Sequence, residues 1–240
     1  MNNLSTEIKK RIPQTLKNLL KSFRDVFYWD SYFQKSWSQE GEDLILQRFF
    51  EGRKEKGFFV DVGAHHPFRF SNTYKFYLKG WRGINIDAMP GSMNPFNKTR
   101  PLDINLEIAV SDKEEILTYF IFNEPALNTF SLEEAEKKIG KNNCKLIEKK
   151  DIVTERLETI FDKYLPQSQS IDFLTIDVEG FDFLVLKSNN WEKYKPEYIL
   201  VEDLESDIEY ALTSNLYNYL SSKGYKLVAR TYNTLFFKLK

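Results

Sequence analysis

The sequence predicts an α/β protein built on an open, doubly wound and mostly parallel sheet. Short apolar runs rich in β-branched and aromatic residues alternate along the chain with segments of helical periodicity. Two of these runs, residues 57–62 and 171–178, carry an acid next to a glycine where they end, which is typical of a buried parallel strand that turns tightly at a ligand site. With 240 residues the chain can form one such domain and a helical extension.

The helical extension is expected over residues 1–35. Apolar residues recur there at helical spacing among lysines and arginines, and Pro13 can open or kink the helix. A basic amphipathic helix can pack against its own domain, against a second copy in a homodimer, or against an anionic membrane as a peripheral contact. Aromatic stripes of this kind are more often buried against protein, so we favour packing.

The remaining residues, 36–240, are expected to form the catalytic domain. In chain order we expect a helix that starts at Ser38, a strand over 57–62, a helix over 73–78 that ends at Gly80, a strand over 82–87, a loop or short helix over 90–101, a strand over 104–110, an extended segment over 117–122, a solvated helix and loop over 131–151, a helix over 154–164, a strand over 171–177, a helix from Phe183, a strand over 198–201, a helix over 208–223, and a hairpin of residues 225–230 and 234–239.

Composition narrows the class of partner and the compartment. The 34 basic and 35 acidic side chains nearly cancel, which argues against nucleic acid as a partner. Cys144 is the single cysteine, so an intramolecular disulfide is excluded and a reducing, cytoplasmic location is expected. No apolar run is long enough to span a bilayer.

Four acidic residues stand at the ends of predicted strands: Asp61, Asp87, Asp177 and Glu202. In a doubly wound sheet the ligand binds outside the carboxyl ends of the strands, so these residues are expected to converge on one site. The spacing from Asp61 to Asp87 (87 − 61 = 26) suits an acid that binds ribose hydroxyls. The turn after the first strand lacks the G-x-G-x-x-G pattern of a pyrophosphate loop, which disfavours a dinucleotide and favours S-adenosylmethionine.

Six short motifs occur in an order that resembles the FkbM-type methyltransferases. They are Ser38-Gln39-Glu40-Gly41-Glu42-Asp43, Val60-Asp61-Val62-Gly63-Ala64-His65, Ser71-Asn72-Thr73, Gly80-Trp81-Arg82-Gly83, Ala109-Val110-Ser111-Asp112 and Ile176-Asp177-Val178-Glu179-Gly180. The resemblance covers roughly residues 36 to 203. It implies a class I, Rossmann-like methyltransferase fold with a seven-stranded sheet whose last strand is antiparallel, and O-methylation of a sugar, glycan precursor or related small metabolite.

The resemblance also implies roles for individual residues. We expect the cofactor to be bound by Asp61, Gly63, Ala64 and His65 at its methionine end, by Asp87 at the ribose, by Ser111 and Asp112 at the adenine edge, and by Gln39 and Glu42 as a lid. Asn72 and Thr73 are expected to contact substrate or cofactor. The alternative for each acid is a structural role as a helix cap or in a surface ion pair.

Transfer of a methyl group to a neutral hydroxyl requires a general base. The candidates are His65, His66, Asp177 and Glu179; we expect Asp177 and Glu179 to form the polar centre and His66 to be the base. A divalent cation held by Asp177, Glu179 and a histidine is an alternative that we do not expect.

Aromatic residues in predicted connecting segments, among them Phe70, Phe96 and Phe130, could stack on a sugar ring or belong to the core. Two other function classes stay open. One is a metal-dependent hydrolase that uses Asp61, His65, His66, Asp177 and Glu179, and the other is a noncatalytic scaffold that docks through the basic N-terminal helix.

Overall fold

The computed structural model describes residues 13–18, 33–141, 143–204 and 207–240. By its internal contacts the chain divides into two units, residues 1–35 and 36–240. In the first unit residues 14–18 are helical, and the rest of the expected N-terminal helix lies outside the described residues. Among the described residues no helix is both long and apolar enough to cross a membrane.

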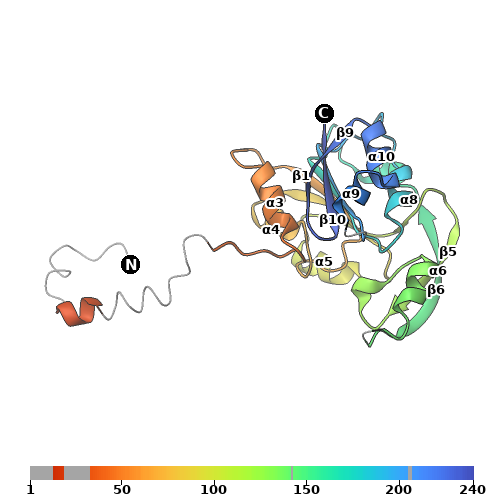
Figure 1. Cartoon of the computed structure of the whole chain (residues 1–240), viewed down its shortest axis with the longest axis horizontal. Coiled ribbons are helices and arrows are strands. Elements are labelled where there is room, and N and C mark those ends of the chain that lie inside the picture. The colour runs from red at the N-terminus through yellow and green to blue at the C-terminus, as the bar shows by residue number, and fades with distance from the viewer. Residues whose placement is uncertain (1–12, 19–32, 142, 205–206) are drawn as a thin grey trace. The chain divides into compact units, whose positions relative to one another are not determined.

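The second unit is centred on a seven-stranded sheet (Figure 1). Its strands are β1 (Phe58–Val62), β2 (Arg82–Asp87), β3 (Ile104–Glu107), β7 (Phe173–Ile176), β8 (Tyr198–Glu202), β9 (Tyr225–Arg230) and β10 (Thr234–Leu239). They lie in the order β3-β2-β1-β7-β8-β10-β9, and β10 alone runs antiparallel to its neighbours β8 and β9. The predicted mostly parallel sheet with an antiparallel last strand is confirmed.

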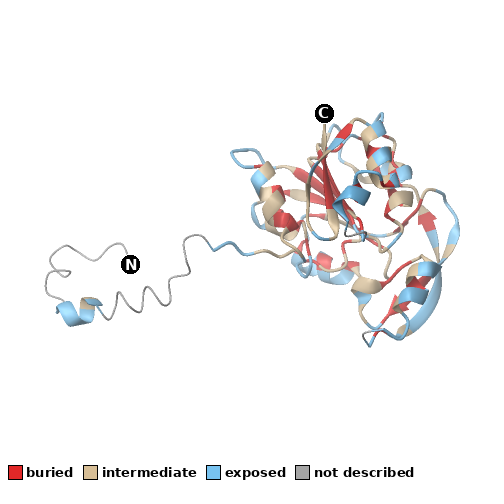
Figure 2. Ribbon diagram, viewed as in Figure 1, coloured by how far each residue is buried: buried red, intermediate tan, exposed pale blue. Residues whose placement is uncertain are grey.

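Two apolar layers cover the sheet, because successive side chains of a strand point to opposite faces. On one face Val60, Val62 and their neighbours pack against α7 (Leu157–Tyr164), α8 (Asp182–Lys187) and α10 (Asn215–Ser222). On the other face Phe59 and Phe173 pack against α3 (Glu42–Phe49) and α4 (Tyr74–Leu78). The central strands are therefore buried on both faces, as Figure 2 shows.

A smaller three-stranded sheet follows β3 in the chain. It contains β4 (Ala109–Val110), β5 (Ile116–Phe122) and β6 (Leu146–Glu155) in the order β4-β6-β5, and η1 (Pro125–Leu127) and α6 (Leu132–Lys138) connect β5 to β6. The expected single strand over 104–110 is wrong, because the backbone leaves the main sheet at Ile108, whose N–H donates to the Asp87 carbonyl over 3.0 Å.

The expected helix and loop over 131–151 is also partly wrong. Residues 132–138 are helical, but residues 146–155 form the long strand β6, which pairs antiparallel with β5. Six of the ten β6 side chains are exposed, and four of those six are charged, so this strand carries no apolar alternation and is held by its backbone pairing to β5. For the same reason the next helix begins at Leu157 and not at residue 154.

Two helix predictions differ from the structure in smaller ways, and the loop or short helix expected over 90–101 is confirmed as a helix. The first helix of the domain begins at Glu42, although the Ser38 hydroxyl does accept a hydrogen bond from the Asp43 N–H (3.2 Å). The segment 90–101 forms the short helix α5 (Met93–Thr99). The expected helix over 208–223 is two helices, α9 (Ile208–Ala211) and α10, because the Ser214 hydroxyl accepts from the Tyr217 N–H (3.1 Å) and starts a new helix.

Candidate active site

A cavity of about 230 Å³ opens at the carboxyl ends of β1, β2, β7 and β8. Of the four acids expected to converge there, Asp87, Asp177 and Glu202 line the cavity. Asp61 is not among the lining residues, because its carboxylate accepts a hydrogen bond from the Thr73 hydroxyl (2.9 Å) below the turn. Three of the four strand-end acids therefore share one site.

The turn after β1 forms one wall of the cavity and depends on Gly63. Gly63 has a φ of 85°, and a Cβ atom at this position would lie 1.7 Å from the Asp177 carbonyl oxygen on the neighbouring strand. The N–H groups of Gly63 and Ala64 both donate to the Ile86 carbonyl, over 2.9 and 3.0 Å. The turn therefore lies close against β7 and leaves room beside it for a ligand, as an acid-glycine bend should.

Asp87 ends β2 at the edge of the same cavity. Its two carboxylate oxygens accept hydrogen bonds from the N–H groups of His65 (2.9 Å) and Met89 (2.8 Å). Burial raises the pKa of Asp87, and these backbone donors act in the opposite direction. Each oxygen keeps a lone pair, so the carboxylate can accept from both hydroxyls of a ribose.

Ala64, Thr73, Ser111 and Asp112 do not line the cavity. Ala64 packs against Met93 and Phe96, which places Phe96 in the core. Thr73 and Ser111 are fully buried, and Asp112 pairs with Lys187 (3.2 Å). The side chains at the expected adenine edge are those of Ile108 and Val110, from the segment where the chain leaves the main sheet.

A smaller pocket adjoins the cavity and shares Gln39, Asp177 and Glu202 with it. Glu42 and Asn72 line this second pocket. The Glu42 carboxylate accepts from the Glu40 N–H (2.8 Å) and the Thr234 hydroxyl (3.3 Å), and the Asn72 amide donates to the Thr175 hydroxyl (3.0 Å). Of the two residues expected to form a lid, Gln39 alone lines the main cavity.

Asp177, Glu179 and Glu202 bring three carboxylates together in the cavity, with one oxygen of each within 4.8 Å of the others. Asp177 is open to the cavity, whereas Glu179 is held by Lys138 of α6 (2.5 Å) and has a φ of 53°. Desolvation and mutual repulsion raise the pKa of Asp177 well above its usual range and that of Glu202 to about 11. Desolvation also raises the pKa of Glu179, against the effect of Lys138. Glu202 therefore keeps its proton at neutral pH.

Neither histidine belongs to this carboxylate group. His65 lines the cavity, and its Nε2 lies 3.2 Å from an Arg69 guanidinium nitrogen. Burial and Arg69 lower the pKa of His65 to about 4, so the ring is neutral. The His66 Nδ1 accepts from the N–H groups of Phe68 (3.3 Å) and Arg69 (3.1 Å), and His66 does not line the cavity. The five residues named for a hydrolase thus do not form one cluster.

The sequence did not indicate the second wall of the cavity, which comes from the small sheet. Tyr119 of β5 stacks near Phe130 (4.5 Å between ring centroids), and Phe130 lies 5.7 Å from Phe181. Phe70 also lines the cavity, so Phe70 and Phe130 are at the site as the aromatic pattern allowed. Tyr119 was not predicted as a site residue because its strand belongs to a sheet that the sequence did not predict.

An ion pair joins the two walls. The Arg69 guanidinium, in the loop after β1, binds both oxygens of Glu124, the residue before η1, over 2.9 Å each. Both residues line the cavity. Opposite charges at these two positions carry no local sequence signal, because 55 residues separate them in the chain.

The site fits S-adenosylmethionine. Gly63 provides a close backbone approach, Asp87 provides acceptors for a ribose, and Ile108 and Val110 provide an apolar surface for a flat base. When bound, this cofactor supplies an electrophilic methyl group.

Comparisons with known proteins identify the family of the chain. No curated protein matches the chain significantly. The family model described as the methyltransferase FkbM domain matches residues 61–227, which is more than half of the sequence. The chain therefore belongs to the FkbM family of S-adenosylmethionine-dependent methyltransferases.

Proposed function

We propose that this methyltransferase transfers the methyl group of S-adenosylmethionine to a hydroxyl of a sugar, glycan precursor or related small metabolite. The observation that carries the proposal is that Gly63 and Asp87 line one cavity together with aromatic rings and the carboxylates of Asp177, Glu179 and Glu202. Aromatic faces pack on the apolar side of a sugar ring, and carboxylates accept hydrogen bonds from its hydroxyls.

The chain's own residues have two tasks in the reaction. The cavity must hold the acceptor oxygen in line with the methyl group, because alignment is the main source of rate for a displacement of this kind. A base must also take the hydroxyl proton. Asp177 is open to the cavity; desolvation, and after it the charge of Glu179, raises the pKa of Asp177, so its ionised form is a stronger base than an ordinary carboxylate.

His66 remains a second candidate for the general base, and two variants distinguish it from Asp177. We expect Asp177→Asn to lower kcat by about a hundredfold or more, the usual effect of losing a general base. His66→Gln tests the second candidate, because it removes the basic ring nitrogen but can still accept hydrogen bonds in the loop. If His66→Gln removes activity and Asp177→Asn leaves it unchanged, the assignment to Asp177 is wrong.

Calorimetry with S-adenosylmethionine and its demethylated product tests the cofactor site. We expect a Kd of roughly 1 to 100 μM for the wild type and no measurable binding for Asp87→Ala. The matched control is Asp162→Ala, an exposed acid that pairs with Lys193 and does not line the cavity. Undiminished binding by Asp87→Ala contradicts the ribose assignment.

A screen of nucleotide-linked sugars and oligosaccharides with a labelled methyl donor tests the acceptor class. The single cysteine supports a cytoplasmic location. Stoichiometric divalent metal in the purified protein, together with no affinity for the cofactor, would favour the hydrolase instead.

A further inference from the structure

Arg100 is a fully buried cation directly below the turn that we assign to the cofactor. It follows α5, and its side chain and that of its partner Asp103 are both 0% exposed. Burying a guanidinium is costly unless its donors are paired, and an apolar side chain in the same space is often at least as stable. The rings of Phe59, Tyr77 and Phe96 lie 5.2 to 5.4 Å from the guanidinium carbon, so an apolar residue would find ready packing there.

The hydrogen bonds of Arg100 lead to the middle and to the end of the loop after β1. One guanidinium nitrogen, Nη1, donates to the Pro67 carbonyl (3.3 Å) and to the Thr73 hydroxyl (3.0 Å). The Thr73 hydroxyl in turn donates to the Asp61 carboxylate (2.9 Å), and Asp61 is two residues before Gly63. The loop is therefore fastened to Arg100 at its middle and at its end, and through Thr73 to the strand from which it leaves.

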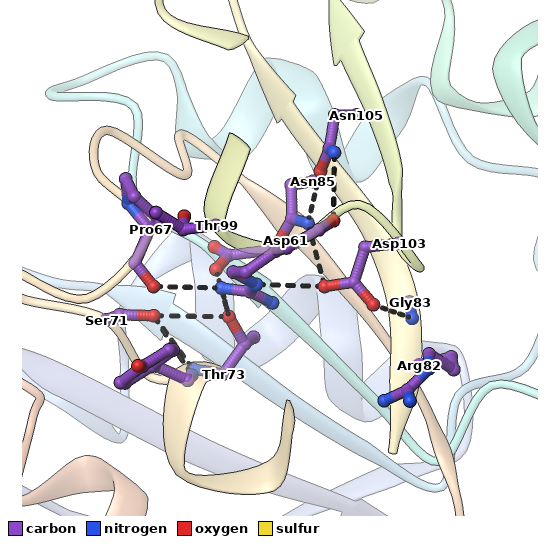
Figure 3. Close-up of polar contacts among 12 residues, drawn as sticks. Asp61, Pro67, Ser71, Thr73, Arg82, Gly83, Asn85, Thr99, Asp103 and Asn105 are labelled. Carbon is purple, nitrogen blue, oxygen red and sulfur yellow. Dashed lines mark hydrogen bonds and ion pairs between the residues drawn. The ribbon is translucent and has the colours of Figure 1, made fainter. Parts of the chain in front are cut away.

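On its other side Arg100 is fixed to β2. Its Nε donates to Asp103 (2.9 Å), and Asp103 accepts from the Gly83 N–H (3.2 Å) and the Asn85 amide (3.2 Å). Figure 3 shows Pro67, Thr73 and Asp61 on one side of this network and Asp103 with Gly83 and Asn85 on the other. The network thus links the two strands whose ends carry Gly63 and Asp87.

We infer that Arg100 is a positioning residue, which holds the Gly63–Pro67 turn and the end of β2 in the arrangement that binds the cofactor. Arg100 does not line the cavity, so it acts through Thr73, Asp61 and Pro67 and not by touching the ligand. The inference rests on the proposed cofactor site. A purely structural ion pair would affect the fraction of folded protein, whereas a positioning residue also changes the affinity of the folded protein.

The test compares Arg100→Met with Arg53→Met in the full chain. Arg53 is the matched control, because it binds Asp172 and Glu197, and the Asp172 carboxylate accepts from the Phe58 N–H at the opposite end of β1. We expect Arg100→Met to raise the Kd for S-adenosylhomocysteine and the KM for S-adenosylmethionine about tenfold or more, with a smaller change in kcat. Arg53→Met should lower the melting temperature and leave both constants within about twofold. Arg100→Lys, which keeps the charge but has a single donor nitrogen in place of three, should restore part of the affinity.

Two further measurements keep the inference falsifiable. If Arg100→Met does not fold, Thr73→Val removes the hydroxyl between Arg100 and Asp61 and leaves the cation in place, and the same rise in Kd is expected. Hydrogen exchange without ligand should be faster over residues 63–73 in the folded Arg100 or Thr73 variant and unchanged there in Arg53→Met. Wild-type affinity in a folded Arg100→Met, or in Thr73→Val, overturns the role of Arg100. If the wild type itself does not bind S-adenosylhomocysteine, the proposed cofactor site is wrong. The hydrogen-exchange measurement then still tests whether Arg100 orders residues 63–73.

Discussion

At the scale of single residues, a comparison of Gly63 with Gly52 separates the cost of a positive φ from the cost of a steric clash. Both have a positive φ, 85° and 84°, but a Cβ atom on Gly63 would meet the Asp177 carbonyl oxygen, and one on Gly52 would meet nothing within 4 Å. The cost of the backbone conformation is therefore common to both positions, and the cost of the clash belongs to Gly63 alone.

We expect Gly63→Ala to lower the free energy of unfolding by about 2 to 4 kcal/mol and Gly52→Ala by about 1 kcal/mol. Gly63→Ala should also lose affinity for the cofactor, because the turn must move away from β7 to make room for the methyl group. Urea unfolding and calorimetry check both statements. Equal destabilisation by the two substitutions would show that the close approach to Asp177 is not what requires glycine.

The carboxylate group in the cavity predicts a dependence of stability on pH. Desolvation and the neighbouring acids raise the pKa of Glu202 to about 11 from 4.5, so the folded protein binds a proton there that the unfolded chain has lost at neutral pH. Stability is then highest below the unfolded pKa and falls as the pH rises through the window between the two values. Glu202→Gln removes this dependence, because the amide carries no charge.

Glu202→Gln should therefore be more stable than the wild type by about 1 to 3 kcal/mol at pH 8 and equal to it near pH 4. Thermal unfolding across this range measures the difference. Glu192→Gln, an exposed glutamate in a surface pair with Lys195, is the control and should change stability by less than about 0.5 kcal/mol at either pH. A wild type that gains stability relative to Glu202→Gln as the pH rises would contradict the raised pKa.

At the scale of elements, an aromatic layer fixes α3 and α4 on the sheet. Phe173 of β7 is fully buried, and its ring lies 5.0 Å from Phe76 and 6.0 Å from both Phe50 and Trp81. Rings in edge and tilted contact add to the free energy gained by burial alone. Helix α4 directly follows the loop that contains the Gly63 turn. The aromatic layer that fixes α4 therefore also supports this side of the site.

We expect Phe173→Ala to cost about 3 to 5 kcal/mol of stability through the cavity it leaves. Ile116→Ala, at a position that is 69% exposed on the small sheet, should cost less than about 1 kcal/mol. Equilibrium unfolding in urea compares the two. Similar values for both would mean that the aromatic layer is not a main source of stability.

At the scale of the whole molecule, residues 36–240 form a compact unit of their own. The cavity residues all belong to this unit. We therefore expect the truncated chain of residues 36–240 to fold and to keep the affinity for S-adenosylhomocysteine within about twofold. Calorimetry on both chains checks this, and loss of binding on truncation would show that residues 1–35 contribute to the site.

Sedimentation with anionic vesicles, with and without residues 1–35, separates the membrane interpretation of the N-terminal helix from the packing interpretation. The noncatalytic scaffold would be favoured if the full chain transfers no methyl group and its docking activity disappears when residues 1–35 are removed.

The main sheet was predictable because its central strands β1, β7 and β8 are buried along nearly their whole length and so are rich in apolar residues. The small sheet was not, because β6 is mostly exposed and has no such run. Gly63 and Asp87 were found at the site because strand ends share one edge of a parallel sheet. His66, Thr73 and Ser111 were expected nearby, but a side chain in a loop points where its backbone turns it, and His65 has a φ of 51° that spacing does not reveal.

The sequence by itself determined the fold class, the family resemblance and the strand ends that form the ligand edge, since these depend on local patterns of apolar residues, acids and glycines. The tertiary structure decided which acids face the cavity, that Tyr119 and the Arg69–Glu124 pair close its far side, and that Arg100 lies below the turn. Those contacts join residues far apart in the chain, so their geometry exists only once the strands and loops are packed.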